Sequence, residues 1–133
     1  MAKFFCVDSP FVEHCFIEAG ERLPDGVRSR VSLRRELTNS WGGAHGGLIA
    51  TILDASMTVA ARYALDAEGR QGVATVDLCT TFIGQAKARV TCEAKLTGRR
   101  GSLLYLEAQA RGEDGELVAR AVATYKVIGK AAE

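Results

Sequence analysis

One carboxylate stands in an apolar segment near the middle of the chain. Between Gly46 and Ala61 the only charged side chain is Asp54. The large apolar residues around it are Leu48, Ile49, Ile52, Leu53, Met57 and Val59. A segment that is apolar on nearly every side is typical of a buried helix. Because a carboxylate removed from water must be paired, hydrogen-bonded or placed at a cavity, we expect Asp54 to line a site. The alternative is a structural carboxylate satisfied by a neighbouring helix start.

A glycine-rich turn leads into this helix and could bind a developing negative charge. The stretch Asn39-Ser-Trp-Gly-Gly-Ala-His45-Gly-Gly47 contains four glycines. Glycines allow the backbone to approach a ligand closely. The first N–H groups of a helix are unpaired within the helix and lie at the positive end of its dipole. The start of the helix is therefore a candidate oxyanion hole.

The spacing of Gly46 and Asp54 predicts a site shared between two copies of the chain. Eight residues separate the two positions, which is roughly 12 Å along a helix at about 1.5 Å per residue. One reacting carbonyl cannot contact both within a single chain. If two antiparallel helices meet across a two-fold axis, the Asp54 of one chain approaches the Gly46 of the other, and two identical sites form.

The composition bounds the class of protein. The 133 residues fit one domain, 1–133. With 17 basic and 16 acidic residues, a net charge of +1 gives no general attraction for nucleic acid or an anionic membrane. No secretory signal stands at the N-terminus, so we expect a cytoplasmic protein. Asp54 and the glycines at the start of the helix argue against a membrane span.

The thiols and imidazoles do not indicate a metal centre. The four cysteines show no Cys-x-x-Cys spacing, and we interpret them as reduced structural thiols. His14 and His45 are the only histidines, too few to complete a convincing set of metal ligands with these cysteines. We therefore predict no metal and no cofactor.

Hydrophobic periodicity predicts an α+β domain. Ser9 and Pro10 predict a short helix that could act as a lid, and residues 27–37 alternate as one half-buried strand. A long helix should run from about His45 to Leu65. Four strands should follow over residues 72–82, 88–96, 103–111 and 117–128, the last two as an antiparallel pair across the link 112–116.

The order of these elements lacks a βαβ rhythm and indicates one antiparallel sheet with one long helix. We expect the sheet to wrap around the helix and bury its apolar circumference. The strand edges and the outer face of the sheet then remain to be covered. The sequence therefore predicts a homo-oligomer.

A known family shares the motifs identified above. The residues concerned are Asn39, Gly43-x-His45-Gly46-Gly47, Leu53-Asp54, Gly72 and Val76-Asp77. In this combination the chain resembles the hotdog-fold thioesterases of the phenylacetate-degradation (PaaI-like) type, over roughly residues 27 to 128. The resemblance implies hydrolysis of acyl-CoA thioesters by a dimer or tetramer, with active sites at the dimer interface.

The resemblance also implies roles for individual residues. Asp54 matches the family's helix carboxylate, which acts as general base on water or as nucleophile. Gly46 matches the residue whose backbone N–H polarises the thioester carbonyl. Asn39 and His45 match positions beside that group, and Thr75 falls where relatives can carry a hydroxyl near the carboxylate. His45 could instead orient the glycine turn, and Asn39 could only cap the loop.

Substrate contacts are expected in two places. The acyl group would enter a slot lined by helix and strand residues, and we expect Gly47, Met57 and Phe82 there, with Val59 and Phe11 as further candidates. The CoA phosphates would need cations at the surface. The candidates are Arg99 and Arg100, with Lys87, Arg89 and Lys126 as alternatives.

Two other functions fit the same fold. A hydroxyacyl- or enoyl-thioester dehydratase or hydratase would need a histidine and a carboxylate placed for proton transfer at adjacent carbons. A non-catalytic acyl-CoA binding module would keep the cavity without needing Asp54. The His-Gly-Gly turn and the carboxylate on the helix favour the thioesterase.

Overall fold

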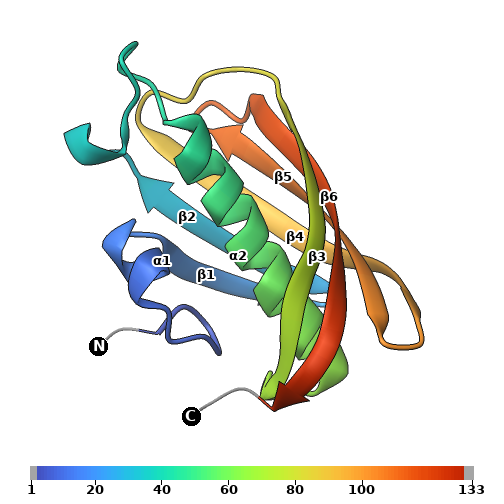
Figure 1. The fold of residues 1–133 in the computed structure, drawn as a ribbon. Helices are drawn as coiled ribbons and strands as arrows, with labels where there is room; N and C mark the ends of the chain where they lie inside the picture. The colour runs from blue at the N-terminus through green and yellow to red at the C-terminus, as the bar shows by residue number, and fades with distance from the viewer. Residues whose placement is uncertain (1–2, 131–133) are drawn as a thin grey trace.

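A single antiparallel sheet curves around one long helix in the computed structural model, which describes residues 3–130 (Figure 1). The helices are α1 (Pro10–His14), a 3₁₀ turn (Arg35–Leu37) and α2 (Gly46–Leu65). The strands are β1 (Glu18–Leu23), β2 (Gly26–Ser32), β3 (Gln71–Phe82), β4 (Arg89–Arg100), β5 (Leu103–Gly112) and β6 (Leu117–Lys130). They form a six-stranded sheet in the order β1-β2-β4-β5-β6-β3. The predicted α+β hotdog architecture is confirmed.

Local contacts explain where α2 begins and ends. Nδ1 of His45 accepts a hydrogen bond from the N–H of Gly47 (2.8 Å), so a histidine caps the helix start. At the other end, the carboxylate of Asp66 accepts backbone N–H groups of Glu68, Arg70 and Gln71. These bonds lower the pKa of Asp66 and turn the chain tightly into β3.

The concave face of the sheet and α2 form the hydrophobic core. Ile52, Leu53 and Met57 of α2 have no exposed surface, and neither do Val90 and Leu104 of the sheet. A buried polar pair lies within this core: the hydroxyls of Ser29 on β2 and Ser56 on α2 are 2.6 Å apart. The helix is therefore fixed against the sheet by a directional bond as well as by packing.

The region before α2 differs from the prediction of one long strand. A hairpin of β1 and β2 stands there, β2 ends at Ser32, and residues 35–37 form the 3₁₀ turn. β1 escaped prediction because most of its side chains are exposed at the edge of the sheet, so no apolar alternation marks it. Leu33 and Leu37 still pack against the core, Leu33 from the loop after β2 and Leu37 from the 3₁₀ turn.

The sheet buries the large apolar residues of α2, as expected, and leaves its small and polar side less covered. One stripe of α2 stays only half-buried, and it contains Ala50, Thr51, Asp54, Ala55 and Thr58. In Figure 1 the chain around α1 and the edge strand β3 lie on opposite sides of α2. By length and composition α2 could span a membrane, yet 56% of its apolar window is buried in the fold, which identifies it as the core helix.

Candidate active site

Two hydroxyl groups hold one oxygen of Asp54. Oδ1 accepts a hydrogen bond from Thr75 Oγ1 of β3 (2.9 Å) and another from the Tyr125 hydroxyl of β6 (2.6 Å). The Tyr125 hydroxyl also lies 3.0 Å from the backbone oxygen of Asp54. Among the described residues no donor reaches Oδ2. One carboxylate oxygen is thus engaged by the protein, and the other has no protein donor within the described residues.

Tyr125 keeps its proton in this environment. The residue is completely buried. Burial raises the pKa of Tyr125, and the negative charge of Asp54 raises it further, while the hydroxyls of Thr58 and Thr75 lower it. The phenol therefore acts as a hydrogen-bond donor to the carboxylate.

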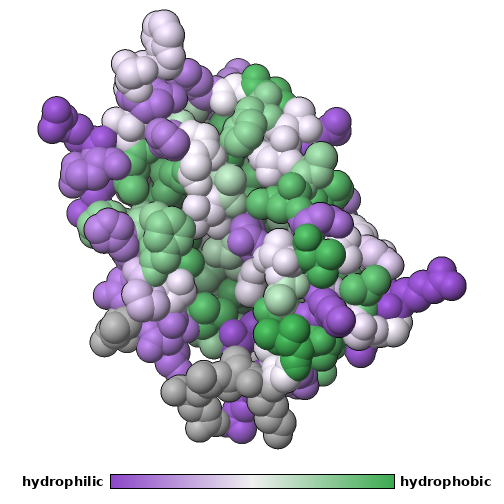
Figure 2. Space-filling view, viewed as in Figure 1, coloured by the Kyte–Doolittle hydropathy of each residue, from purple (hydrophilic) through white to green (hydrophobic). Residues whose placement is uncertain are grey.

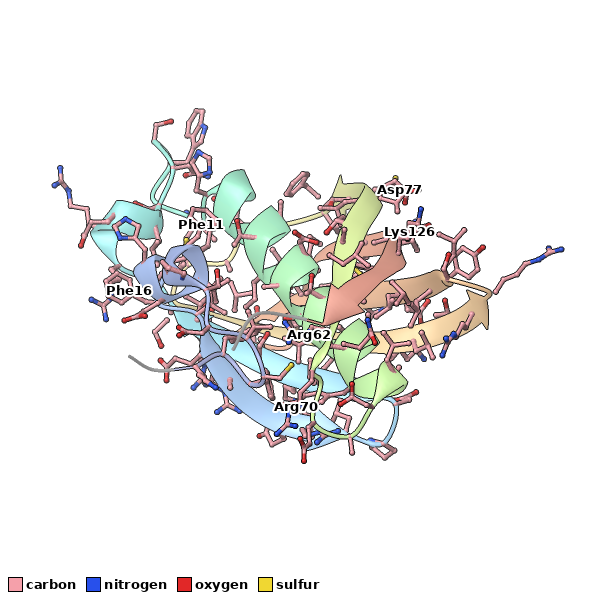
Figure 3. The ribbon with its side chains drawn as sticks, turned by 60° about the horizontal axis from the view of Figure 1, so that its bottom comes forward. Phe11, Phe16, Arg62, Arg70, Asp77 and Lys126 are labelled. Atoms are coloured by element: carbon pink, nitrogen blue, oxygen red, sulfur yellow. The ribbon has the colours of Figure 1, made fainter. Side chains whose placement is uncertain are left out.

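A cavity of about 360 Å³ opens beside Asp54. One wall is the half-buried stripe of α2, the opposite wall is the N-terminal segment, and Leu78 of β3 contributes at the edge. The lining residues are Phe4, Val7, Ser9, Phe11, Val12, Ala50, Thr51, Asp54, Ala55, Thr58 and Leu78. Figure 3 shows Phe11 on the α1 side of α2 and Asp77 on the β3 side. The cavity is mostly apolar and has one charged group.

The start of α2 presents a free donor. His45 is exposed and its Nδ1 already accepts from Gly47, so in the neutral imidazole the proton resides on Nε2. The N–H of Gly47 is thereby used in capping the helix. The N–H of Gly46 finds no acceptor among the described residues. Gly46 therefore presents an unpaired N–H at the positive end of the helix.

The Asn39 side chain is committed to its own loop. Its Oδ1 accepts the N–H groups of Trp41 (2.9 Å) and Gly43 (3.2 Å), and its Nδ2 donates weakly to the backbone oxygen of Ala44 (3.4 Å). This is an Asx-type turn, which supports the loop-capping interpretation. Asn39 shapes the turn that leads to His45 and Gly46.

The predicted substrate contacts are spread over the molecule. Phe82 is 56% exposed, and its Cε1 lies 3.6 Å from the place that a Cβ on Gly46 would take. Met57 does not line the cavity, because its position on α2 faces the sheet and it is wholly buried. Arg99 and Arg100 end β4, are exposed, and lie outside the cavity lining. Phe11 does line the cavity.

Tyr125 is the site residue that the sequence analysis missed. The signal available was its position on the predicted strand 117–128, where Ala119, Ala121 and Ala123 alternate as the inward face. A tyrosine on the same face is buried with its hydroxyl and so needs a partner. Between Gly46 and Ala61 of the facing helix, Asp54 was the only charged group.

Neither a metal centre nor an activated thiol is found within residues 3–130. No group of three or more His, Cys, Asp and Glu side chains lies close enough together to hold a metal ion. Burial raises the pKa of Cys6 and Cys15, and raises that of Cys92 to about 12. Thiols in such surroundings are poor nucleophiles.

Comparison with known proteins places this fold in one class. Two solved structures share the fold: a thioesterase of Haemophilus influenzae (20% identity, TM-score 0.84, covering 93% of this chain and 85% of that one) and a provisionally assigned esterase of Mycobacterium tuberculosis (22%, 0.83, 93% and 100%). At these identities the similarity shows a common hotdog architecture.

The sequence match is more specific. The model of the thioesterase superfamily matches residues 42–119, which include the four glycines of the turn, α2 and Thr75. The chain therefore belongs to the thioesterase superfamily. A provisionally assigned esterase of Halobacterium salinarum is 32% identical over 80 residues, which cover 57% of this chain and 53% of that protein. The chain thus matches about half the length of this curated relative.

Proposed function

We propose that this protein hydrolyses acyl-CoA thioesters to a free acid and CoA. The observation that carries the proposal is Asp54, a carboxylate with one oxygen free, at the wall of a mostly apolar cavity in a chain of the thioesterase superfamily. An acyl group would occupy the apolar cavity, and its carbonyl carbon would lie near Oδ2 of Asp54. The thioesterase name of the Haemophilus relative agrees with this chemistry.

Hydrolysis would need two groups acting on the same carbonyl. As general base, Asp54 takes a proton from water while the water oxygen bonds to the carbonyl carbon; as nucleophile, its oxygen bonds to that carbon first. In either route the carbonyl oxygen becomes negative, the C=O bond re-forms and the C–S bond breaks. In the nucleophile route the product is an anhydride on Asp54, which water then hydrolyses to the free acid and the regenerated carboxylate. CoA leaves as a thiolate, which needs little protonation because thiols are acidic.

The oxyanion donor would come from a second copy of the chain. Gly46 lies eight residues before Asp54, or roughly 12 Å along α2, so it cannot serve the same carbonyl. The Gly46 N–H of an antiparallel partner helix can do so. His45 would keep that N–H in place by capping the helix, and Asn39 would hold the preceding loop.

The edge strand β3 is the favoured place for two copies to meet. Both β1 and β3 are edges of the sheet. β1 carries three charged residues, Glu18, Glu21 and Arg22, whereas β3 exposes Val76 and Phe82 and has Asp77 as its one charged residue. Charged edges resist pairing while apolar ones invite it. Figure 2 shows apolar side chains, in green, gathered over the β3 edge on this face. We infer a homodimer through β3, with the outer sheet faces joining two dimers into a tetramer.

The other substrate contacts belong to the same proposal. Phe82, next to Gly46, would touch the thioester or the pantetheine arm, and Arg99 and Arg100 would bind the CoA phosphates as exposed cations. We propose a cytoplasmic location, which suits four free cysteines within the described residues.

The dehydratase or hydratase alternative is less favoured by the geometry. Such chemistry needs an imidazole and a carboxylate that exchange protons with neighbouring carbons, but Nδ1 of His45 is occupied by the N–H of Gly47 in the helix cap. A non-catalytic binding module would have no use for a carboxylate held by two donors.

Release of CoA thiol from a panel of short-, medium-, long-chain and aryl acyl-CoAs tests the proposal. The wild type should turn over part of the panel, and Asp54→Asn should lose most turnover while it keeps the oligomer and binds the substrate. Equal turnover in Asp54→Asn would contradict the assigned role. Binding of acyl-CoA without thiol release by either protein would favour the binding module.

A further inference from the structure

Thr75 and Tyr125 form one unit in the sheet. They are direct register partners on β3 and β6, and both hydroxyls donate to the same carboxylate oxygen, Oδ1 of Asp54. Paired residues on neighbouring strands point to the same face, here the face that holds α2. The two donors thus lie on one pair of opposing strand residues rather than on flexible loops.

We propose that Tyr125 is a positioning residue for thioester hydrolysis: with Thr75 it clamps Oδ1 of Asp54 and leaves Oδ2 as the reactive oxygen. This inference rests on the proposed function of Asp54. A carboxylate held by one donor can swing about its side-chain bonds, whereas two donors from two strands fix the plane of the group. A base or nucleophile that is already oriented saves reorganisation during the reaction.

Burial restricts the side chain of Tyr125 more than that of Thr75, the other donor to Asp54. Its side chain has no exposed surface, while Thr75 stands exposed on the edge strand. The Tyr125 hydroxyl has one proton to share between Oδ1 at 2.6 Å and the backbone oxygen of Asp54 at 3.0 Å, and the shorter contact goes to the charged acceptor. Through the same hydroxyl, β6 is tied to the middle of α2.

The substitution Tyr125→Phe removes the hydroxyl and keeps the ring in the core. We expect kcat to fall by about tenfold or more, since hydrogen bonds to charged groups are among the stronger ones, with KM within about twofold because the acyl cavity is unchanged. Tyr105→Phe is the matched control, because Tyr105 is a partly exposed tyrosine of β5 outside the cavity lining.

The split between kcat and KM separates positioning from packing. A positioning role lowers kcat in Tyr125→Phe while KM stays close to that of Tyr105→Phe, because the acyl cavity is unchanged. A purely structural role of Tyr125 would lower the melting temperature without this selective loss of kcat.

The outcomes distinguish the two proposals. A wild type that releases no thiol from any thioester overturns the proposed function and, with it, the role of Tyr125. An active wild type whose Tyr125→Phe variant keeps the kcat of the Tyr105→Phe control overturns only the positioning role. If Tyr125→Phe fails to fold, Thr75→Val removes the other donor at an exposed position, and its kcat should fall in the same way; an unchanged kcat there refutes the clamp.

Discussion

The backbone at Gly46 tests the oxyanion donor without touching the carboxylate. A Cβ at this position would lie 3.6 Å from Cε1 of Phe82, an ordinary contact, so Gly46→Ala should fold and assemble like the wild type. The added methyl would stand beside the N–H where the carbonyl must approach. We expect kcat to fall by about tenfold or more and KM to rise, as measured by steady-state kinetics.

Gly129→Ala provides the control for that substitution. Gly129 lies near the end of β6, and a Cβ there would meet nothing within 4 Å. Its kinetics and melting temperature should equal those of the wild type. If Gly46→Ala also has wild-type kinetics, the proposal that the substrate closely approaches the start of α2 is wrong.

At the scale of elements, the Ser29–Ser56 bond fixes α2 against β2. Both hydroxyls are fully buried and 2.6 Å apart. Ser56→Ala leaves the Ser29 hydroxyl buried without this partner, so the free energy of unfolding in urea should drop by about 1–3 kcal/mol. In the double variant Ser29→Ala/Ser56→Ala part of that loss should return. If the loss in the free energy of unfolding of the double variant equals the sum of the losses of the two single variants, the bond does not couple the two elements.

The helix α1 offers a test of the acyl cavity. Phe11 lines the cavity yet is 61% exposed, so Phe11→Ala should leave the melting temperature unchanged. The loss of its apolar surface should raise KM by roughly threefold or more for the preferred acyl-CoA, with little effect on kcat. If Phe11→Ala and the wild type have the same KM for every acyl length, the acyl group does not lie under α1.

At the scale of the whole molecule, oligomerisation and activity should depend on the β3 edge together. Val76 on β3 is 56% exposed. Val76→Asp places a charge where we expect the two copies to pair, so sedimentation should show a monomer, and thioesterase activity should be lost although Asp54, Thr75 and Tyr125 are intact.

Val122→Asp is the companion variant. Val122 on the outer face of β6 has nearly the same exposure, 57%. If the outer sheet faces join two dimers, this variant should sediment as a dimer and stay active. An active monomer from Val76→Asp would refute the shared site.

The strongly patterned elements were predictable, and the weakly patterned ones were not. The helix α2 was expected over 45–65 and runs over 46–65. A long apolar segment that follows a glycine-rich turn and ends before a glycine is typical of a buried helix. The strand β4 alternates cleanly and was also expected. β1 was missed because an exposed edge strand needs no apolar side chains; its partner β2 supplies the hydrogen bonds that define it.

The sequence by itself determined the features that are local to one segment. Asp54 in an apolar helix and the glycines before it are neighbours along the chain, and their periodicity and turn chemistry follow from their order. The sequence also offered, as alternatives, that His45 orients the glycine turn and that Asn39 caps its loop. Both could be read from residue type and position because capping and Asx turns are local contacts.

Only the tertiary structure decided what surrounds the carboxylate. Tyr125 lies 71 residues from Asp54 in sequence, and the pairing of β3 with β6 brings it beside Thr75. The N-terminal segment closes the cavity from the other side, and Met57 turns to the core although it is only three residues from Asp54. Which residues meet in this way depends on strand order and on the rotation of the helix against the sheet, which are set by the packing of the whole core.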